Sequence, residues 1–137
     1  MKKEFEIINY DDGTVNVEVN FDKENDTVWL TKLEIARLFD VDKSRVVRHI
    51  SNIYSDGELE EISTSAENAL VRFEGSRPIR RNVILYNLDV ILAVGYRVNS
   101  KKGVAFRKWV SEITKKYLKE GYVINEKRLA YQKNKLI

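Results

Sequence analysis

Apolar and polar residues alternate near the start of the chain, which is the pattern of a strand with one buried face. Residues 4–21 predict a β-hairpin, because Asp11-Asp12-Gly13 supplies a turn and the strand after it alternates strictly, with Val15, Val17, Val19 and Phe21 apolar. Residues 28–30 predict a further short strand. We expect the hairpin to cover one side of the core or to pair with another chain.

The apolar spacing changes at residue 31, and residues 31–54 predict two short helices joined by a tight corner. Thr31 can cap the first helix, and Glu34 three residues later completes a capping box. Residues 40–42 are too few to form anything except the corner. The second helix should bury apolar residues that recur at helical spacing: Val46, Val47, Ile50, Ile53 and Tyr54.

The outward face of the second helix has no carboxylate. It should present groups that hydrogen-bond to phosphates and base edges: Lys43 at the helix start, then Ser44, Arg45, Arg48, His49 and Asn52. A helix-turn-helix places its second helix in the DNA major groove with such donors facing out. The helix pair therefore predicts binding to double-stranded DNA. The alternative is an ordinary helical hairpin whose charged face is solvated.

A second hairpin is predicted after an acidic link over residues 56–61. Residues 68–73 and 80–86 have the pattern of strands, and residues 74–78, which include the only proline, are the expected turn. A hairpin soon after a recognition helix is the wing of a winged helix-turn-helix. Wing arginines reach phosphates or the minor groove, and this hairpin carries Arg77, Arg80 and Arg81. The alternative is a surface hairpin whose arginines are solvated.

The rest of the chain predicts helices. Asn87 can cap a largely apolar, buried helix over residues 88–98, and Asn99-Ser100 should interrupt the chain before a longer helix over residues 101–120. That longer helix should turn Phe106, Trp109, Val110, Ile113 and Tyr117 inward. Three lysines recur every seven residues on another side of it: Lys101, Lys108 and Lys115. Gly121 is its expected C-cap, and residues 125–137 look like the opening of a further helix, as in the front part of a longer protein.

Composition and charge allow this interpretation. The chain has 137 residues and a net charge of +3. It has no cysteine, so disulfides and thiolate metal sites are excluded. No membrane span and no signal peptide are evident, and the cytoplasm is the expected location. The charge is uneven: residues 1–30 hold three lysines against eight carboxylates, whereas residues 100–137 hold eleven Lys and Arg against three. Only part of the surface should therefore face a polyanion.

Several segments together resemble a known family. They are TVWLT before the first helix, RHISNIY and DGEL at the end of the second, YNLDVILAVGYRVNS, FRKWV and YLKEGY. The combination resembles the RhuM-like virulence proteins over most of residues 10–125, and the FRKWV helix is also similar to the end of phage Bro-N and KilA-N type DNA-binding domains. The resemblance implies a protein of a mobile element or prophage that binds DNA, and family members that continue past this length.

Catalysis has little support in the sequence. His49 is the only histidine, and without cysteine or a second histidine it cannot build a metal cluster. The six glycines form no phosphate-binding loop, and no serine has an evident base. Glu58, Glu60 and Glu61 are better explained as a solvated acidic link than as a nuclease site. We expect no enzymatic activity, no cofactor and no small-molecule ligand.

The sequence thus predicts an α+β protein with a winged helix-turn-helix-like domain, an N-terminal β-hairpin and C-terminal helices. Its regions are residues 1–30, 31–86, 87–124 and 125–137. The expected function is double-stranded DNA binding, as a regulatory or targeting module. Two alternatives remain open: an adaptor whose helix pair docks a partner protein, and the non-catalytic front part of a toxin-like protein.

We also expect a homodimer, because one helix-turn-helix reads only one groove. Two surfaces could form it. One is the Val15–Phe21 strand as an open sheet edge, and the other, which we favour, is the C-terminal helix with a group of apolar residues near the chain end: Leu129, Tyr131, Leu136 and Ile137.

Overall fold

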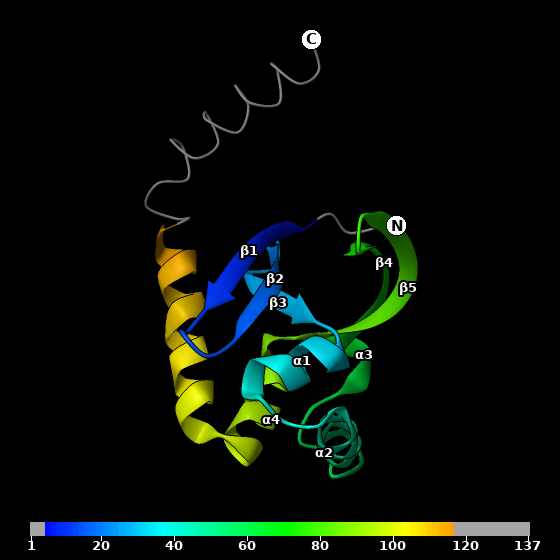
Figure 1. Ribbon diagram of the computed structural model, residues 1–137. Coiled ribbons are helices and arrows are strands. Elements are labelled where there is room, and N and C mark those ends of the chain that lie inside the picture. Colours follow the sequence, from blue (N-terminus) through cyan, green and yellow to red (C-terminus); the bar gives the residue numbers. More distant parts are fainter. Residues whose placement is uncertain (1–4, 117–137) are drawn as a thin grey trace. The chain divides into compact units, whose positions relative to one another are not determined.

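One five-stranded antiparallel sheet and five helices make up the part of the chain that the computed structural model describes, residues 5–116 (Figure 1). The strands are β1 (Glu6–Asp11), β2 (Asn16–Asp22), β3 (Thr27–Leu30), β4 (Ser65–Glu74) and β5 (Arg77–Asn87). The helices are α1 (Lys32–Phe39), α2 (Lys43–Ser55), α3 (Glu61–Thr64), α4 (Leu88–Val98) and a last helix over residues 100–116. The α+β class is therefore confirmed.

The chain divides into two compact units after Gly103. The first unit holds the whole sheet and α1 to α4. The second begins at Val104, within the last helix; there Phe106 and Val110 are buried, and the rings of Phe106 and Trp109 stack with centroids 5.7 Å apart. These residues were predicted to face inward, and Ile113 is half-buried. Tyr117, Gly121 and residues 125–137 lie outside the described residues.

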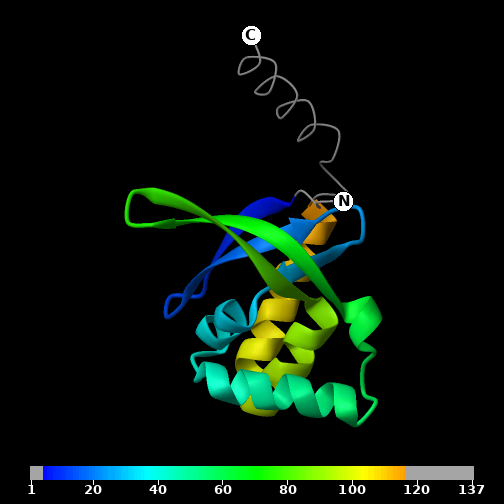
Figure 2. The ribbon, with the colours of Figure 1, turned by 90° about the vertical axis from the view of Figure 1, so that its right-hand side faces the viewer.

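The strand order in the sheet is β1-β2-β3-β5-β4. The predicted hairpin of β1 and β2 and the short strand β3 are confirmed, and β3 then pairs with the distant β5 through Trp29–Asn87 and Leu30–Tyr86. This long-range pairing joins the N-terminal hairpin to the segment that follows the helix pair. Figures 1 and 2 show α1 and α4 on one side of the sheet, with α2 beyond them.

The prediction that the Val15–Phe21 strand is an open edge is wrong. β2 pairs with β1 on one side and with β3 on the other, from Asn20–Trp29 to Asp22–Thr27. Side-chain bonds reinforce that pairing: Asn20 Nδ2 donates to the Trp29 carbonyl oxygen at 2.9 Å, and Trp29 Nε1 donates to Asp22 Oδ2 at 3.0 Å. The short loop after β2 folds β3 back along its C-terminal end, so β2 is an interior strand of the sheet.

The core of the first unit is apolar and comes from the sheet, α1, α2 and α4. Alternation along β2 places Val17, Val19 and Phe21 inside, as predicted. The fully buried side chains with the largest volumes in this unit are Phe39, Leu30, Ile35, Leu38, Ile53, Leu85, Ile91, Val19, Val28, Val46 and Val90. Both α1 and α2 contribute to this core, so the helix pair is fixed to the sheet and to α4.

The second hairpin is longer than predicted. β4 and β5 pair from Ser65–Tyr86 to Glu74–Arg77, and the turn contains only Gly75 and Ser76. Gly75 has φ +65° at the first turn position, the left-handed conformation that favours glycine. Pro78 was expected in the turn but lies in β5, opposite Phe73. Proline is tolerated there because β3 pairs with β5 only at Tyr86 and Asn87.

Helix α4 approaches its neighbours most closely at Gly95. A Cβ atom at this position would lie 2.5 Å from Cζ of Phe39, whose ring is 1% exposed at the end of α1. It would also lie 3.3 Å from Cα of Gly103 in the next helix. Asn87 and Asn99 cap the two helices as predicted: their Oδ1 atoms accept from the backbone N–H groups of Val90 and Lys102 at 3.3 and 3.2 Å.

Gly95→Ala should therefore destabilise the first unit by about 1–3 kcal/mol, because the added methyl group overpacks against a ring that has nowhere to move. Gly103→Ala is the matched control. Its Cβ would meet the Tyr96 ring at 3.1 Å, and Tyr96 is 44% exposed and can turn away. Urea unfolding of both variants measures the difference, and equal free energies of unfolding for the two would contradict the prediction.

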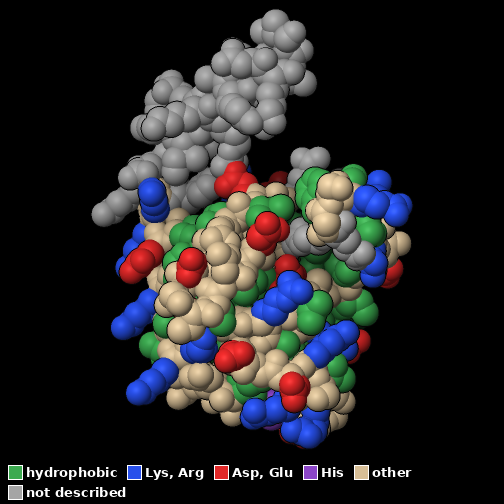
Figure 3. Space-filling model, in the orientation of Figure 1, with side chains coloured by type: hydrophobic (Ala, Val, Ile, Leu, Met, Phe, Trp, Pro, Cys, Tyr) green, Lys and Arg blue, Asp and Glu red, His purple; other side chains and the backbone are tan. Residues whose placement is uncertain are grey.

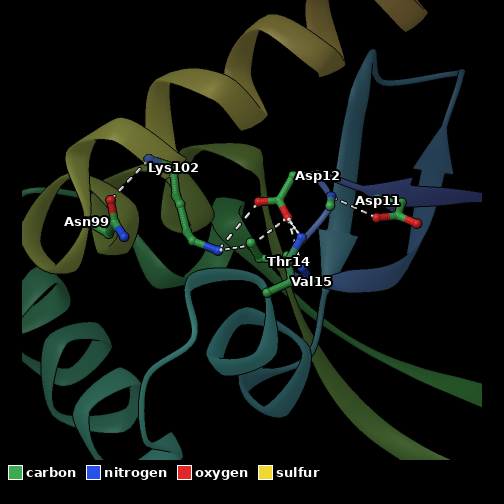
Figure 4. Close-up of polar contacts among 7 residues, drawn as sticks. Asp11, Asp12, Thr14, Val15, Asn99 and Lys102 are labelled. Atoms are coloured by element: carbon green, nitrogen blue, oxygen red, sulfur yellow. Dashed lines mark hydrogen bonds and ion pairs between the residues drawn. The ribbon is translucent and has the colours of Figure 1, made fainter.

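The turn between β1 and β2 is tied to the start of the last helix (Figure 4). Asp12 Oδ1 accepts from the backbone N–H groups of Thr14 and Val15 at 2.9 and 2.8 Å. Lys102 Nζ donates to Asp12 Oδ2 at 3.4 Å and to Thr14 Oγ1 at 3.0 Å. The bonds from Val15 and Thr14, with the Lys102 charge as a smaller cause, hold the pKa of the Asp12 carboxyl well below its usual range.

A lowered pKa in the folded state means that the ionised Asp12 stabilises the fold above the unfolded-state pKa. That contribution is lost as the pH falls below about 4, where the unfolded chain takes up the proton first. Asp12→Asn should therefore be less stable than the wild type at pH 7, and the difference should shrink toward pH 2. Thermal unfolding across this range checks it, and a constant difference would count against this role of Asp12.

Candidate nucleic-acid interface

Helix α1 begins with the predicted capping box. Thr31 Oγ1 accepts from the Glu34 backbone N–H at 3.1 Å, and Glu34 Oε1 accepts from the Thr31 N–H at 2.9 Å. Two backbone donors at the helix start are thereby satisfied reciprocally, which fixes where the helix begins. The confirmed cap fixes the first residue of α1 and so the positions of the side chains along it.

The corner between α1 and α2 is as tight as predicted. Asp40 ends α1 in the left-handed conformation, at φ 54° and ψ 52°, and Val41 N–H donates to the Ala36 carbonyl oxygen at 3.0 Å. Asp42 is the N-cap of α2 but makes no side-chain cap hydrogen bond. Three residues therefore reverse the chain, and α2 starts with its own backbone N–H groups near the surface.

One face of α2 is buried and the opposite one is exposed. Val46, Ile50 and Ile53 are at most 3% exposed, and α2 packs on α1 and α4. The exposed residues include five of the predicted contacts: Lys43, Ser44, Arg45, Arg48 and Asn52. The helix contains no Asp or Glu at all. In Figure 3, Lys and Arg side chains gather at the lower end of the molecule, where Figure 1 places α2.

His49 lies at the margin of this exposed face and not fully on it, which agrees only in part with the prediction. It is half-buried, and its Nδ1 atom is buried without a hydrogen-bond partner among the described residues. His49 precedes Ile53 by one helical turn and therefore points to the margin of the buried face. Burial first, and then the charges of Arg48, Arg97 and Arg45, lower its pKa. The lowered pKa makes the charged form of the ring less available for a contact with phosphate.

Val47 and Tyr54 mark the other margin of the same face. Val47 was expected to be buried but is 39% exposed, because the buried stripe centres on Val46 and Ile50 and leaves it to one side. Tyr54 is half-buried, and its hydroxyl lies 2.9 Å from Thr64 Oγ1. Burial raises the pKa of the Tyr54 hydroxyl. This contact ties α2 to α3, the short helix at the end of the acidic link. The sequence pattern did not indicate this helix.

The acidic link is directed partly toward α4. Glu58 Oε1 accepts from the Arg97 guanidinium at 3.1 Å, with about a third of the Arg97 side chain exposed. Such a surface pair contributes on the order of 0–1 kcal/mol. The pair also neutralises the charge of one carboxylate of the acidic link beside α2.

The hairpin arginines lie on both faces of the β4–β5 ribbon. Arg77, Arg80 and Arg81 are all exposed. Side chains alternate along a strand, and the register places Arg80 opposite Val71 on one face and Arg81 opposite Leu70 on the other, together with Arg77. The predicted cluster is therefore divided between two faces, although all three residues lie near the tip.

The predicted lysine stripe is also exposed. Lys101, Lys108 and Lys115 lie seven residues apart, close to two turns, in the last helix. Lys101 belongs to the first unit, and Lys108 and Lys115 belong to the second. Within residues 5–116, no group of three or more acidic or His side chains could hold a metal ion. In the same range, no helix is both long enough and apolar enough to cross a membrane.

Comparison with known proteins gives one informative result. No curated protein and no solved structure matches the chain. A family model described as the virulence protein RhuM family matches residues 63–136. The match begins at the end of α3 and covers β4, β5, α4 and the rest of the chain to residue 136, so α1 and α2 precede it. Because more than half of the chain is matched, this protein belongs to the RhuM virulence protein family.

Proposed function

We propose that α1 and α2 form a helix-turn-helix that binds double-stranded DNA. The observation that carries the proposal is the two-sided character of α2. Its apolar side chains are held by α1 and α4, and its outer surface presents Lys43, Arg45, Arg48, Ser44 and Asn52 without a carboxylate. Arg and Asn pair in bidentate fashion with guanine and adenine edges in the major groove. Lys43, in the first turn, suits a phosphate contact.

Other cations support the same partner. β5 contains three arginines and no Asp or Glu, and the last helix carries its exposed lysine stripe. Phosphate contacts of this kind add affinity that does not depend on base sequence. In this proposal the β4–β5 hairpin takes the role of the wing of a winged helix-turn-helix.

Family membership suggests where such an activity is used. We propose a virulence-associated regulatory or targeting module of a mobile element, without enzymatic activity of its own and located in the cytoplasm. Docking of a partner protein is the second candidate. It is favoured by exposed apolar residues on the helix pair, namely Leu33 at 46% and Val47 at 39%.

Fluorescence anisotropy with a random-sequence duplex at two salt concentrations tests the proposal. Affinity should fall steeply with salt, with a log–log slope of about −0.9 for each phosphate contacted. Arg45→Ala with Arg48→Ala should weaken binding to the preferred site by about 1–3 kcal/mol for each arginine that contacts a base. Wild-type affinity in the double variant would remove α2 as the reading helix and leave the adaptor as the better candidate.

Two further variants control this experiment. Lys23→Ala removes a cation from the β2–β3 loop, on the sheet side of the first unit, and should leave the affinity unchanged. Asp42→Asn keeps a good N-cap residue and removes a carboxylate at the start of α2, so the affinity should rise. Opposite signs for Asp42→Asn and for the arginine variants separate an effect of charge at the helix from an effect on folding.

We further propose that the working unit is a homodimer, because two half-sites are usually read by a symmetric pair. β2 lies between β1 and β3 in the sheet, and the favoured residues, Leu129, Tyr131, Leu136 and Ile137, lie outside the described residues. Sedimentation of the full chain at tens of micromolar should show a dimer. A monomer at this concentration would contradict the proposal.

A further inference from the structure

The distal part of the β4–β5 ribbon carries exposed apolar side chains on one face. Phe73 is 70% exposed, and Val71 and Ile84 are each 53% exposed. The register places Phe73 beside Pro78 and Val71 beside Arg80, and Ile84 lies on the same face nearer the root of the ribbon. A stripe of this kind on a soluble surface indicates an interaction site.

This stripe is not part of the core. β3 pairs with β5 only at Tyr86 and Asn87, and no other described strand pairs with the ribbon beyond that point. Figure 2 shows the ribbon reaching past the rest of the sheet, with its tip on the same side as the first turn of α2. The tip is narrow, since Gly75 and Ser76 alone close it.

Charge decides which partner fits. Arg80 lies on the apolar face, and Arg77 and Arg81 lie on the opposite face. A ribbon inside a DNA groove has a phosphate backbone on each side, so cations on both of its faces are suited to that position. A second copy seated on the apolar face would bring its Arg80 against the Arg80 of the first, and like charges face to face are destabilising.

We propose that the ribbon enters the minor groove of duplex DNA, where Phe73 with Pro78 wedges between two base pairs and bends the helix axis. This inference depends on the proposed DNA-binding function. Apolar wedges from minor-groove proteins unstack a base step and kink the duplex, and flanking Arg side chains hold the narrowed groove. The tip offers both components, an exposed apolar pair and arginines within a few residues of it.

End-to-end fluorescence energy transfer on a duplex of about 30 bp with a central flexible TA step measures the bend at saturating protein. The wild type should bend the duplex by about 20–90°. Phe73→Ala should lose most of the change in transfer. Ile84→Ala is the matched control, an exposed apolar residue on the same face but away from the tip, and it should bend DNA like the wild type. Arg80→Ala should weaken binding without changing the bend at saturation.

The outcomes separate this inference from the proposed function. Binding without a bend, or a full bend by Phe73→Ala, overturns the wedge and leaves DNA binding intact. The absence of any binding to the duplex at low salt overturns both. In that case, a dimer that dissociates in Phe73→Ala but not in Ile84→Ala would identify a second copy of the chain as the occupant of the stripe.

Discussion

The close contact between Phe39 and Gly95 is the constraint on which the arrangement of the first unit depends. Phe39 is the last residue of α1, so the place where its ring is buried determines where the corner lies and where α2 begins. Only a residue without a Cβ lets α4 pass close enough to cover that ring. The exposed cations of α2 are therefore positioned by an apolar contact at the end of α1, just before the corner.

Features that depend on neighbouring residues could be predicted from the sequence. The Thr31–Glu34 capping box, the Asp11–Gly13 turn and the Asn87 cap each require only a few residues whose side chains bond to nearby backbone groups. Their partners lie within three residues, so no knowledge of the tertiary fold was needed. The alternating pattern of β2 identified its buried face for the same reason.

Features that depend on distant segments could not be predicted from the sequence. Nothing local indicates that β5 lies between β3 and β4, and this pairing makes β3 an interior strand. Helical spacing predicted the centre of the buried face of α2 but not its width. His49 and Val47 lie at its two margins, where the pattern had placed His49 fully outside and Val47 inside. Pro78 suggested a turn, because the sequence does not show that β5 is left unpaired by β3 at that position. Arg80 was grouped with Arg77 and Arg81 for want of the strand register.

The root of the ribbon has a mechanical consequence. β5 runs without interruption from Arg77 at the tip to Asn87, which pairs with Trp29 and whose side chain caps α4. The ribbon is thus attached to the rest of the unit at one end only, and a displacement of its tip is transmitted along β5 to the first turn of α4. Because α2 packs on α4, the position of the ribbon and the position of α2 both depend on this one attachment. Loss of the Asn87 contacts would therefore loosen the ribbon and α2 at the same time.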